Sequence, residues 1–106
     1  MFEIREEVRA DRRDFVLVGE LDMAGTDALE KAVLAGSAAG VTRVVFDLRE
    51  LTFIDSTGLR ALVAVHDLCR ARGCEVALIP GRRAVQRVFD LTGLADVLPF
   101  APGATA

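Results

Sequence analysis

Two adjacent hydroxyl side chains, Ser56 and Thr57, stand where an apolar stretch gives way to a helical pattern. They follow Phe53-Ile54-Asp55 and precede Gly58. An Asp, Ser or Thr at the start of a helix can cap the unpaired N–H groups of the first turn. The same N–H groups and the helix dipole stabilise a phosphate added there. The segment therefore indicates either an ordinary strand-to-helix cap or a hydroxyl whose modification switches the protein.

Other residue types give little support to catalysis. His66 is the only histidine and stands ten positions after Ser56 on a largely apolar helical face, which favours a packed or surface role over that of a general base. The nucleophile-elbow pattern G-x-S-x-G and a Walker phosphate loop are both missing from the sequence. Asp22, Asp47 and Asp55 stand at expected strand ends, where capping and turn roles are favoured over Mg²⁺ binding. We therefore expect no catalytic residue, no metal and no cofactor.

Composition restricts the class of protein. The 106 residues are 52% hydrophobic with a mean hydropathy of +0.35, which can supply the core of one domain. The net charge of −3 offers no basic field for nucleic acid. No apolar run approaches the roughly 18 residues of a membrane span, and the first residues lack a signal-peptide pattern, so we expect a cytoplasmic protein. Cys69 and Cys74 lack metal-ligand or redox spacing and are expected to be reduced and structural.

Alternating patterns predict strands and helices in turn. Strands over residues 2–8 and 15–19, joined by a charged turn at 11–14, are expected to form an antiparallel hairpin. The next elements are expected to be a helix opened by Asp22 or Thr26 and ending near 36–40, a buried strand over 41–48 and a helix from Ser56 to about Arg72. They are followed by a strand over 75–79, a helix that begins after the turn at 80–81 and ends before Gly93, and a short edge strand over 97–100. Parallel crossovers added to the hairpin give an α/β fold with a mixed sheet.

Side chains on the two later helices indicate how those helices pack. The helix that begins near Ser56 is expected to turn Leu59, Leu62, Val63, His66 and Cys69 toward the core. The last helix begins with a basic cluster formed by Arg82, Arg83 and Arg87. Cations at a helix N-terminus oppose its dipole, so this cluster is either a solvated face or a docking patch.

Three separated motifs resemble those of the bacterial anti-sigma factor antagonists, whose single domain is called STAS. Gly19-Glu20-Leu21-Asp22 resembles the turn that closes an early strand of that family, and Val85-Gln86-Arg87-Val88-Phe89-Asp90-Leu91-Thr92-Gly93-Leu94 is similar to its last helix. The segment from Asp47-Leu48 through Phe53-Ile54-Asp55-Ser56-Thr57-Gly58-Leu59 resembles its phosphorylation loop. The motifs match in order and spacing and span most of the chain. The resemblance implies a STAS domain over residues 1–100, and the composition of residues 101–106 indicates a flexible tail.

The same resemblance implies a regulatory role for Ser56. The matching serine of the family is phosphorylated by a partner that is both an anti-sigma factor and a serine kinase. The unphosphorylated antagonist, whose serine can cap the helix, binds this partner and releases the sigma factor, whereas the phosphorylated form cannot bind until a serine phosphatase restores it. A second implied possibility is a non-catalytic STAS subunit of a stress-signalling or lipid-transport assembly, in which Ser56 is never modified.

Residues around Ser56 are expected to contact the partner. They are Asp22, Asp55, Thr57, Gly58, Leu59 and Arg60. Asp22 matches the acidic residue of the family's early turn, although a helix cap is an equal alternative. Gly58 either lets a partner backbone approach or accommodates the turn, and Leu59 either packs inward or joins the contact surface. Arg60 departs from the family, which often has a small residue here, and can pair with the phosphate or discriminate among kinases.

Overall fold

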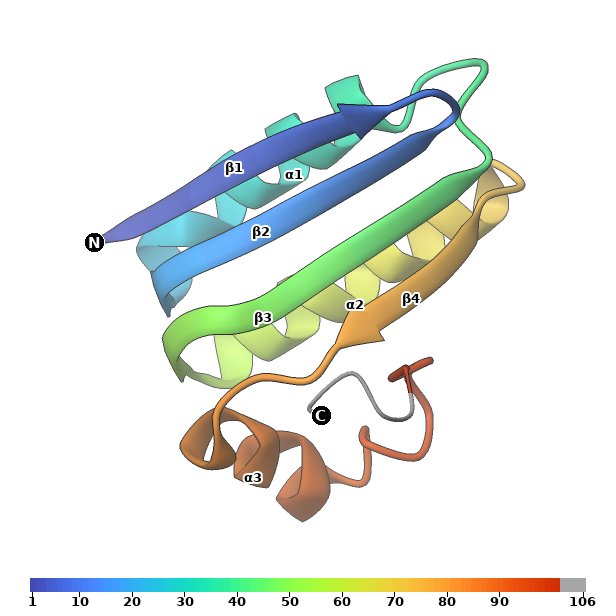
Figure 1. Ribbon diagram of the computed structural model, residues 1–106. Coiled ribbons are helices and arrows are strands. Elements are labelled where there is room, and N and C mark those ends of the chain that lie inside the picture. The colour runs from blue at the N-terminus through green and yellow to red at the C-terminus, as the bar shows by residue number, and fades with distance from the viewer. Residues whose placement is uncertain (102–106) are drawn as a thin grey trace.

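The computed structural model describes residues 1–101 of the chain as one mixed sheet with helices (Figure 1). The elements in chain order are β1 (Phe2–Arg9), β2 (Arg12–Leu21), the short 3-10 helix η1 (Met23–Gly25), α1 (Thr26–Gly36), β3 (Arg43–Ile54), α2 (Ser56–Ala71), β4 (Glu75–Ile79) and α3 (Arg83–Thr92). The strand order is β1-β2-β3-β4, in which β1 pairs with β2 antiparallel and the other pairs are parallel. The predicted α/β fold with an initial hairpin is confirmed.

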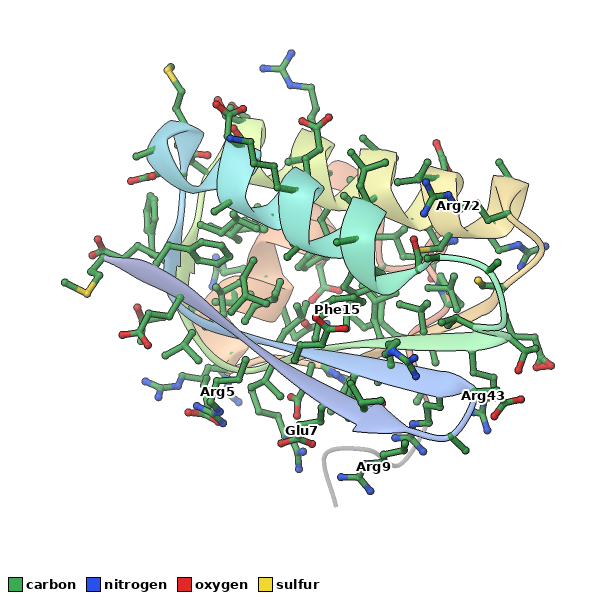
Figure 2. All side chains as sticks on the ribbon, turned by 90° about the horizontal axis from the view of Figure 1, so that it is seen from above. Arg5, Glu7, Arg9, Phe15, Arg43 and Arg72 are labelled. Atoms are coloured by element: carbon green, nitrogen blue, oxygen red, sulfur yellow. The ribbon has the colours of Figure 1, made fainter. Side chains whose placement is uncertain are left out.

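Helices α1 and α2 cover one face of the sheet, and charged side chains cover the other (Figures 1 and 2). Figure 2 shows Arg5, Glu7 and Arg9 projecting from the face that lies away from these helices. On that face the guanidinium of Arg5 lies 2.6 Å from the carboxylate of Glu50. An uncovered sheet face needs such polar side chains, since an apolar one would promote association.

The hydrophobic core lies between α1, α2 and the sheet, and α3 adds Val85 and Phe89 to it. Helix α2 buries Leu59, Leu62 and Cys69, as the spacing predicts, and Val65 is buried beside them. His66 lies at the margin of this face, where its Nδ1 is 3.0 Å from a carboxylate oxygen of Asp67. None of the helices within residues 1–101 has the length and apolar composition that crossing a bilayer requires.

Two strands are longer than the sequence indicates. Strand β2 begins at Arg12 rather than at residue 15, because the charged side chains of Arg12 and Asp14 pair with each other at 2.6 Å within the strand. Strand β3 continues beyond Leu48 to Ile54, and register shifts between β2 and β3 interrupt its two-residue alternation. The predicted charged turn over 11–14 and the predicted strand end at 48 are therefore wrong.

The predicted edge strand over 97–100 is also wrong. Within the described chain this segment makes one isolated bridge, between Phe100 and Leu78, and Val97 is 70% exposed. The amides of Val97 and Leu98 both donate to the carbonyl of Leu94, which forms a helical turn in place of a strand. Of the predicted tail, residues 102–106 lie outside the described residues.

Both cysteines are buried and free, as expected of structural thiols. Burial, with a smaller contribution from Cys74, raises the pKa of the Cys69 thiol to about 11. Cys69 lies in the last turn of α2 and Cys74 lies beyond its end, after a left-handed Gly73 with φ of +85°. The amide of Cys74 donates to the carbonyl of Cys69 at 3.0 Å. These bonds satisfy the last turn of the helix and direct the chain into β4.

Candidate functional site

The first turn of α2 is capped by Asp55, which precedes Ser56. Asp55 has extended backbone angles, φ −108° and ψ −175°, and its Oδ1 accepts a hydrogen bond from the amide of Gly58 at 2.8 Å. Its carbonyl accepts from the amide of Leu59 at 2.9 Å. Because Ser56 is already the first residue of the helix, its hydroxyl does not serve as the cap. The expectation that the unmodified serine caps α2 is therefore wrong.

The Ser56 side chain is exposed, and its hydroxyl makes no hydrogen bond to any residue of the described part of the chain. Thr57 is half-buried beside it. The cap by Asp55 leaves the Ser56 hydroxyl accessible to an approaching reagent without loss of the helix start. The hydroxyl stands at the positive end of a 16-residue helix, where the dipole and the first-turn N–H groups favour a negatively charged group.

Gly58 and Leu59 support the site from within. A Cβ on Gly58 would overlap the carbonyl oxygen of Leu21 and would stand 2.9 Å from its carbonyl carbon. The close approach at Gly58 is thus made by the chain's own backbone at the end of β2. Leu59 is 5% exposed and belongs to the core. These two residues position the first turn of α2 against β2.

Asp22 lies at the end of the neighbouring strand and begins η1. Its Oδ1 accepts a hydrogen bond from the amide of Ala24 at 3.0 Å. Since Leu21 pairs with Ile54, β2 and β3 end side by side, and the two capping residues Asp22 and Asp55 follow at the same edge of the sheet. The carboxyl ends of parallel strands are the usual place for binding sites in α/β folds.

Sequence reasoning missed two large apolar side chains at this edge. Met23 is 73% exposed on η1, and Phe53 is 49% exposed near the end of β3. The alternation of Phe53 with the buried Ile54 is the signal that could have shown Phe53 to face outward. Arg60 is exposed one turn after Ser56 and has no ion-pair partner within residues 1–101.

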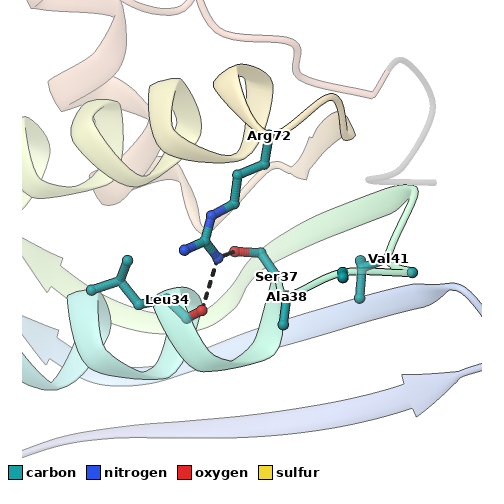
Figure 3. Close-up of a pocket in the computed structure, with 7 residues that line it drawn as sticks. Leu34, Ser37, Ala38, Val41 and Arg72 are labelled. Atoms are coloured by element: carbon teal, nitrogen blue, oxygen red, sulfur yellow. Dashed lines mark hydrogen bonds between the residues drawn. The ribbon is translucent and has the colours of Figure 1, made fainter.

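A separate cavity of about 420 Å³ lies at the other end of α2 (Figure 3). There one guanidinium nitrogen of Arg72 donates to the carbonyl of Leu34 and to the hydroxyl of Ser37, both at 2.8 Å. Arg72 thereby ties the end of α2 to the end of α1, which is a structural role. No cluster of His, Cys, Asp and Glu suited to a metal ion is found in the described residues.

The model of the STAS domain family matches residues 2–104. The chain belongs to the STAS domain family. This STAS domain is 33% identical over 85 residues to the putative anti-sigma factor antagonist BtrV of Bordetella bronchiseptica, covering 80% of this chain and 73% of BtrV. It is also 33% identical over 86 residues to the anti-sigma-F factor antagonist RsfA of Mycobacterium tuberculosis, covering 79% of this chain and 67% of RsfA.

The fold of this STAS domain also agrees with a solved structure. The crystal structure of an anti-sigma factor antagonist from Mycobacterium paratuberculosis superimposes with a TM-score of 0.82 at 28% identity, over 96% of this chain and 86% of that one. The resemblance indicated by the three sequence motifs is thereby confirmed at the level of family and fold.

Proposed function

We propose that this STAS domain is an anti-sigma factor antagonist that binds an anti-sigma factor through the first turn of α2 and is switched off by phosphorylation of Ser56. One observation carries the proposal: the Ser56 hydroxyl is exposed at the start of a helix whose cap is already supplied by Asp55. Membership of the family and the antagonist names of BtrV and RsfA support the class of partner.

The proposed switch is electrostatic. A phosphate on Ser56 adds about −1.5 to −2 charges and three acceptor oxygens. The N-terminus of α2 favours this negative charge. The Gly58 amide, however, already donates to the Asp55 carboxylate, which would stand next to the phosphate. The phosphate therefore projects outward, where a partner surface must desolvate it. Placing an unpaired charge in an interface costs about 2–5 kcal/mol, enough to abolish a moderate affinity.

The domain contributes the acceptor, and its partners contribute the chemistry. In the kinase step the Ser56 oxygen takes the γ-phosphoryl group of ATP, ADP leaves, and the hydroxyl proton passes to a base of the kinase. A serine phosphatase restores the hydroxyl by hydrolysis. The proposed switch needs two partners, an anti-sigma factor with serine kinase activity and a serine phosphatase, and the proposal includes a cytoplasmic location for the domain.

Phosphorylation by candidate anti-sigma kinases tests the site. The full chain and the variants Ser56→Ala and Thr57→Val are incubated with each kinase and Mg-ATP, then analysed by intact mass and peptide mapping. We expect one phosphoryl group on the wild type and on Thr57→Val, and none on Ser56→Ala. A phosphate mapped to Thr57 would refute the residue assignment. No phosphorylation by any kinase of the same organism would instead favour a subunit role in a stress-signalling or lipid-transport assembly.

A further inference from the structure

The two cysteines stand five positions apart in the sequence, on either side of the tight turn from α2 into β4 (Figure 1). The amide of Cys74 donates to the carbonyl of Cys69 at 3.0 Å, and the amide of Gly73 donates to the carbonyl of Arg70 at 3.0 Å. Together with the left-handed Gly73, these two bonds form a Schellman motif, in which the side chains at the positions of Cys69 and Cys74 are commonly in contact. The turn therefore brings together two thiols that their sequence spacing separates.

The surroundings of the two thiols agree with this proximity. Cys74 Sγ donates to the carbonyl of Val41 at 3.3 Å, and the Cys69 thiol lies beside the hydroxyl of Ser37. Ser37 and Val41 belong to the same short segment between α1 and β3, so both thiols face that segment. Burial raises the pKa of Cys69 to about 11 and Cys74 adds to the rise, which requires the two sulfur atoms to be close. Both cysteines are free thiols.

The two thiols differ in how a small reagent reaches them. Cys69 is fully buried, whereas Cys74 is 4% exposed and lines a surface cavity of about 250 Å³ together with Arg70, Gly73 and Glu75. Such a cavity has room for several molecules the size of water, which occupies roughly 30 Å³ in the liquid. A small neutral oxidant such as hydrogen peroxide therefore reaches Cys74 first.

We propose that Cys69 and Cys74 form a reversible oxidation site, in which Cys74 reacts with hydrogen peroxide and Cys69 then closes a disulfide. In the first step Cys74 gives up its proton and its sulfur attacks one peroxide oxygen. The O–O bond breaks, the departing hydroxide takes up a proton to form water, and Cys74 becomes a sulfenic acid. In the second step the Cys69 sulfur attacks the Cys74 sulfur, the S–O bond breaks, and a second water leaves with the Cys69 proton. The thiols lose two electrons, peroxide gains them, and a thiol reductant reverses the change.

The disulfide would link the last turn of α2 covalently to the residue that precedes β4. Disulfides in a reducing compartment are usually transient and redox-sensing, which fits a pair that is reduced at rest. Ser56 begins the same helix and Cys69 lies in its last turn, so oxidation and phosphorylation would act at opposite ends of α2. The cysteine pair lies outside the proposed partner site, and its oxidation can fail while the proposed function stands.

Mass spectrometry of the full chain tests the pair. The chain is reduced, freed of reductant, treated with hydrogen peroxide, and then unfolded and alkylated without reduction. We expect the intact mass to fall by two hydrogen atoms, no cysteine to be alkylated, and one digest product to join Cys69 to Cys74. Dithiothreitol should restore both alkylatable thiols. Two thiols that remain alkylatable in the wild type, a disulfide between two copies of the chain, or a sulfinic acid on Cys74 without a disulfide would overturn the proposal.

Two variants, checked for folding by circular dichroism, separate the roles of the cysteines. Cys69→Ala should stop at a sulfenic acid on Cys74, which dimedone captures. Cys74→Ala should react at least about tenfold more slowly than N-acetylcysteine, because the burial that raises the pKa of Cys69 to about 11 leaves little thiolate. A dimedone adduct that forms rapidly on Cys69 in Cys74→Ala would contradict the assigned order of reaction.

Discussion

Replacement of Gly58 by Ala is expected to destabilise the domain, although Ala is the better helix former. The new Cβ would overlap the carbonyl oxygen of Leu21 and stand 2.9 Å from its carbonyl carbon, both of which are backbone atoms at the end of β2. Overpacking of this kind costs about 1–3 kcal/mol, and a backbone obstacle points to the upper value. After subtraction of about 1 kcal/mol gained in helix propensity, about 2 kcal/mol of net destabilisation remains.

Urea unfolding followed by circular dichroism measures this free energy. A loss of about 2 kcal/mol should also lower Tm by about 8–16 °C in a domain of this size. Ala64→Gly is the matched control, because Ala64 is exposed in the same helix and its replacement reports helix propensity alone, at a cost of about 1 kcal/mol. If Gly58→Ala proved as stable as the wild type or more stable, the close approach of α2 to β2 would be refuted.

Three further variants test the site and its surroundings. Asp55→Ala should cost about 1 kcal/mol in urea unfolding through loss of the cap, and Asp55→Asn should cost less because it keeps an acceptor oxygen. Asp47 is buried, which raises its pKa, but hydrogen bonds from Arg49 outweigh burial and hold the pKa below 3.8. The wild type should therefore have its full stability advantage over Asp47→Asn above pH 3.8 and lose it as the pH falls through the lower pKa that Asp47 has in the folded state. An advantage that persisted unchanged in strong acid would contradict this linkage. Arg60→Ala should change the free energy of unfolding by about 0.5 kcal/mol or less while altering the rank order of kinases that act on the domain. The control Arg87→Ala removes an exposed cation from α3 and should leave that order unchanged. An unchanged order in both variants would exclude a selectivity role for Arg60.

Regular spacing of apolar residues, with Gly and Pro at the ends of elements, made much of the fold predictable. Strand β4 was predicted at residues 75–79 and observed at Glu75–Ile79, because Gly73 and Pro80 bracket a short apolar run. Leu59, Leu62 and Cys69 recur at helical spacing, which was sufficient to orient α2. In both elements the local pattern and the tertiary packing agree.

Prediction failed where distant contacts decide the local structure. The charges of Arg12 and Asp14 read as a turn, yet they neutralise each other and lie within β2. The second half of β3 could not be recognised from the sequence, because register shifts against β2 break the alternation of buried and exposed residues that is typical of a strand. The bridge between Phe100 and Leu78 likewise depends on where the chain returns to β4.

The candidate site was predictable in location but not in detail. Asp, Ser and Thr are all good caps, so the sequence alone did not separate Asp55 from Ser56; the extended backbone of Asp55 and the helical position of Ser56 do so. The role of Gly58 depends on Leu21, which is remote in sequence, and only the paired strand ends reveal it. The exposure of Met23 depends in the same way on how η1 packs.

The dissociation constant for one anti-sigma factor, measured by titration calorimetry with unphosphorylated chain and with chain fully phosphorylated on Ser56, tests the proposed switch most directly. We expect the phosphorylated form to bind at least about thirtyfold more weakly, which corresponds to the lower limit of about 2 kcal/mol for an unpaired charge in an interface. Its melting temperature should stay close to that of the unphosphorylated form, because the phosphate projects from an exposed position at a helix N-terminus. Equal dissociation constants for the two forms would contradict the switch.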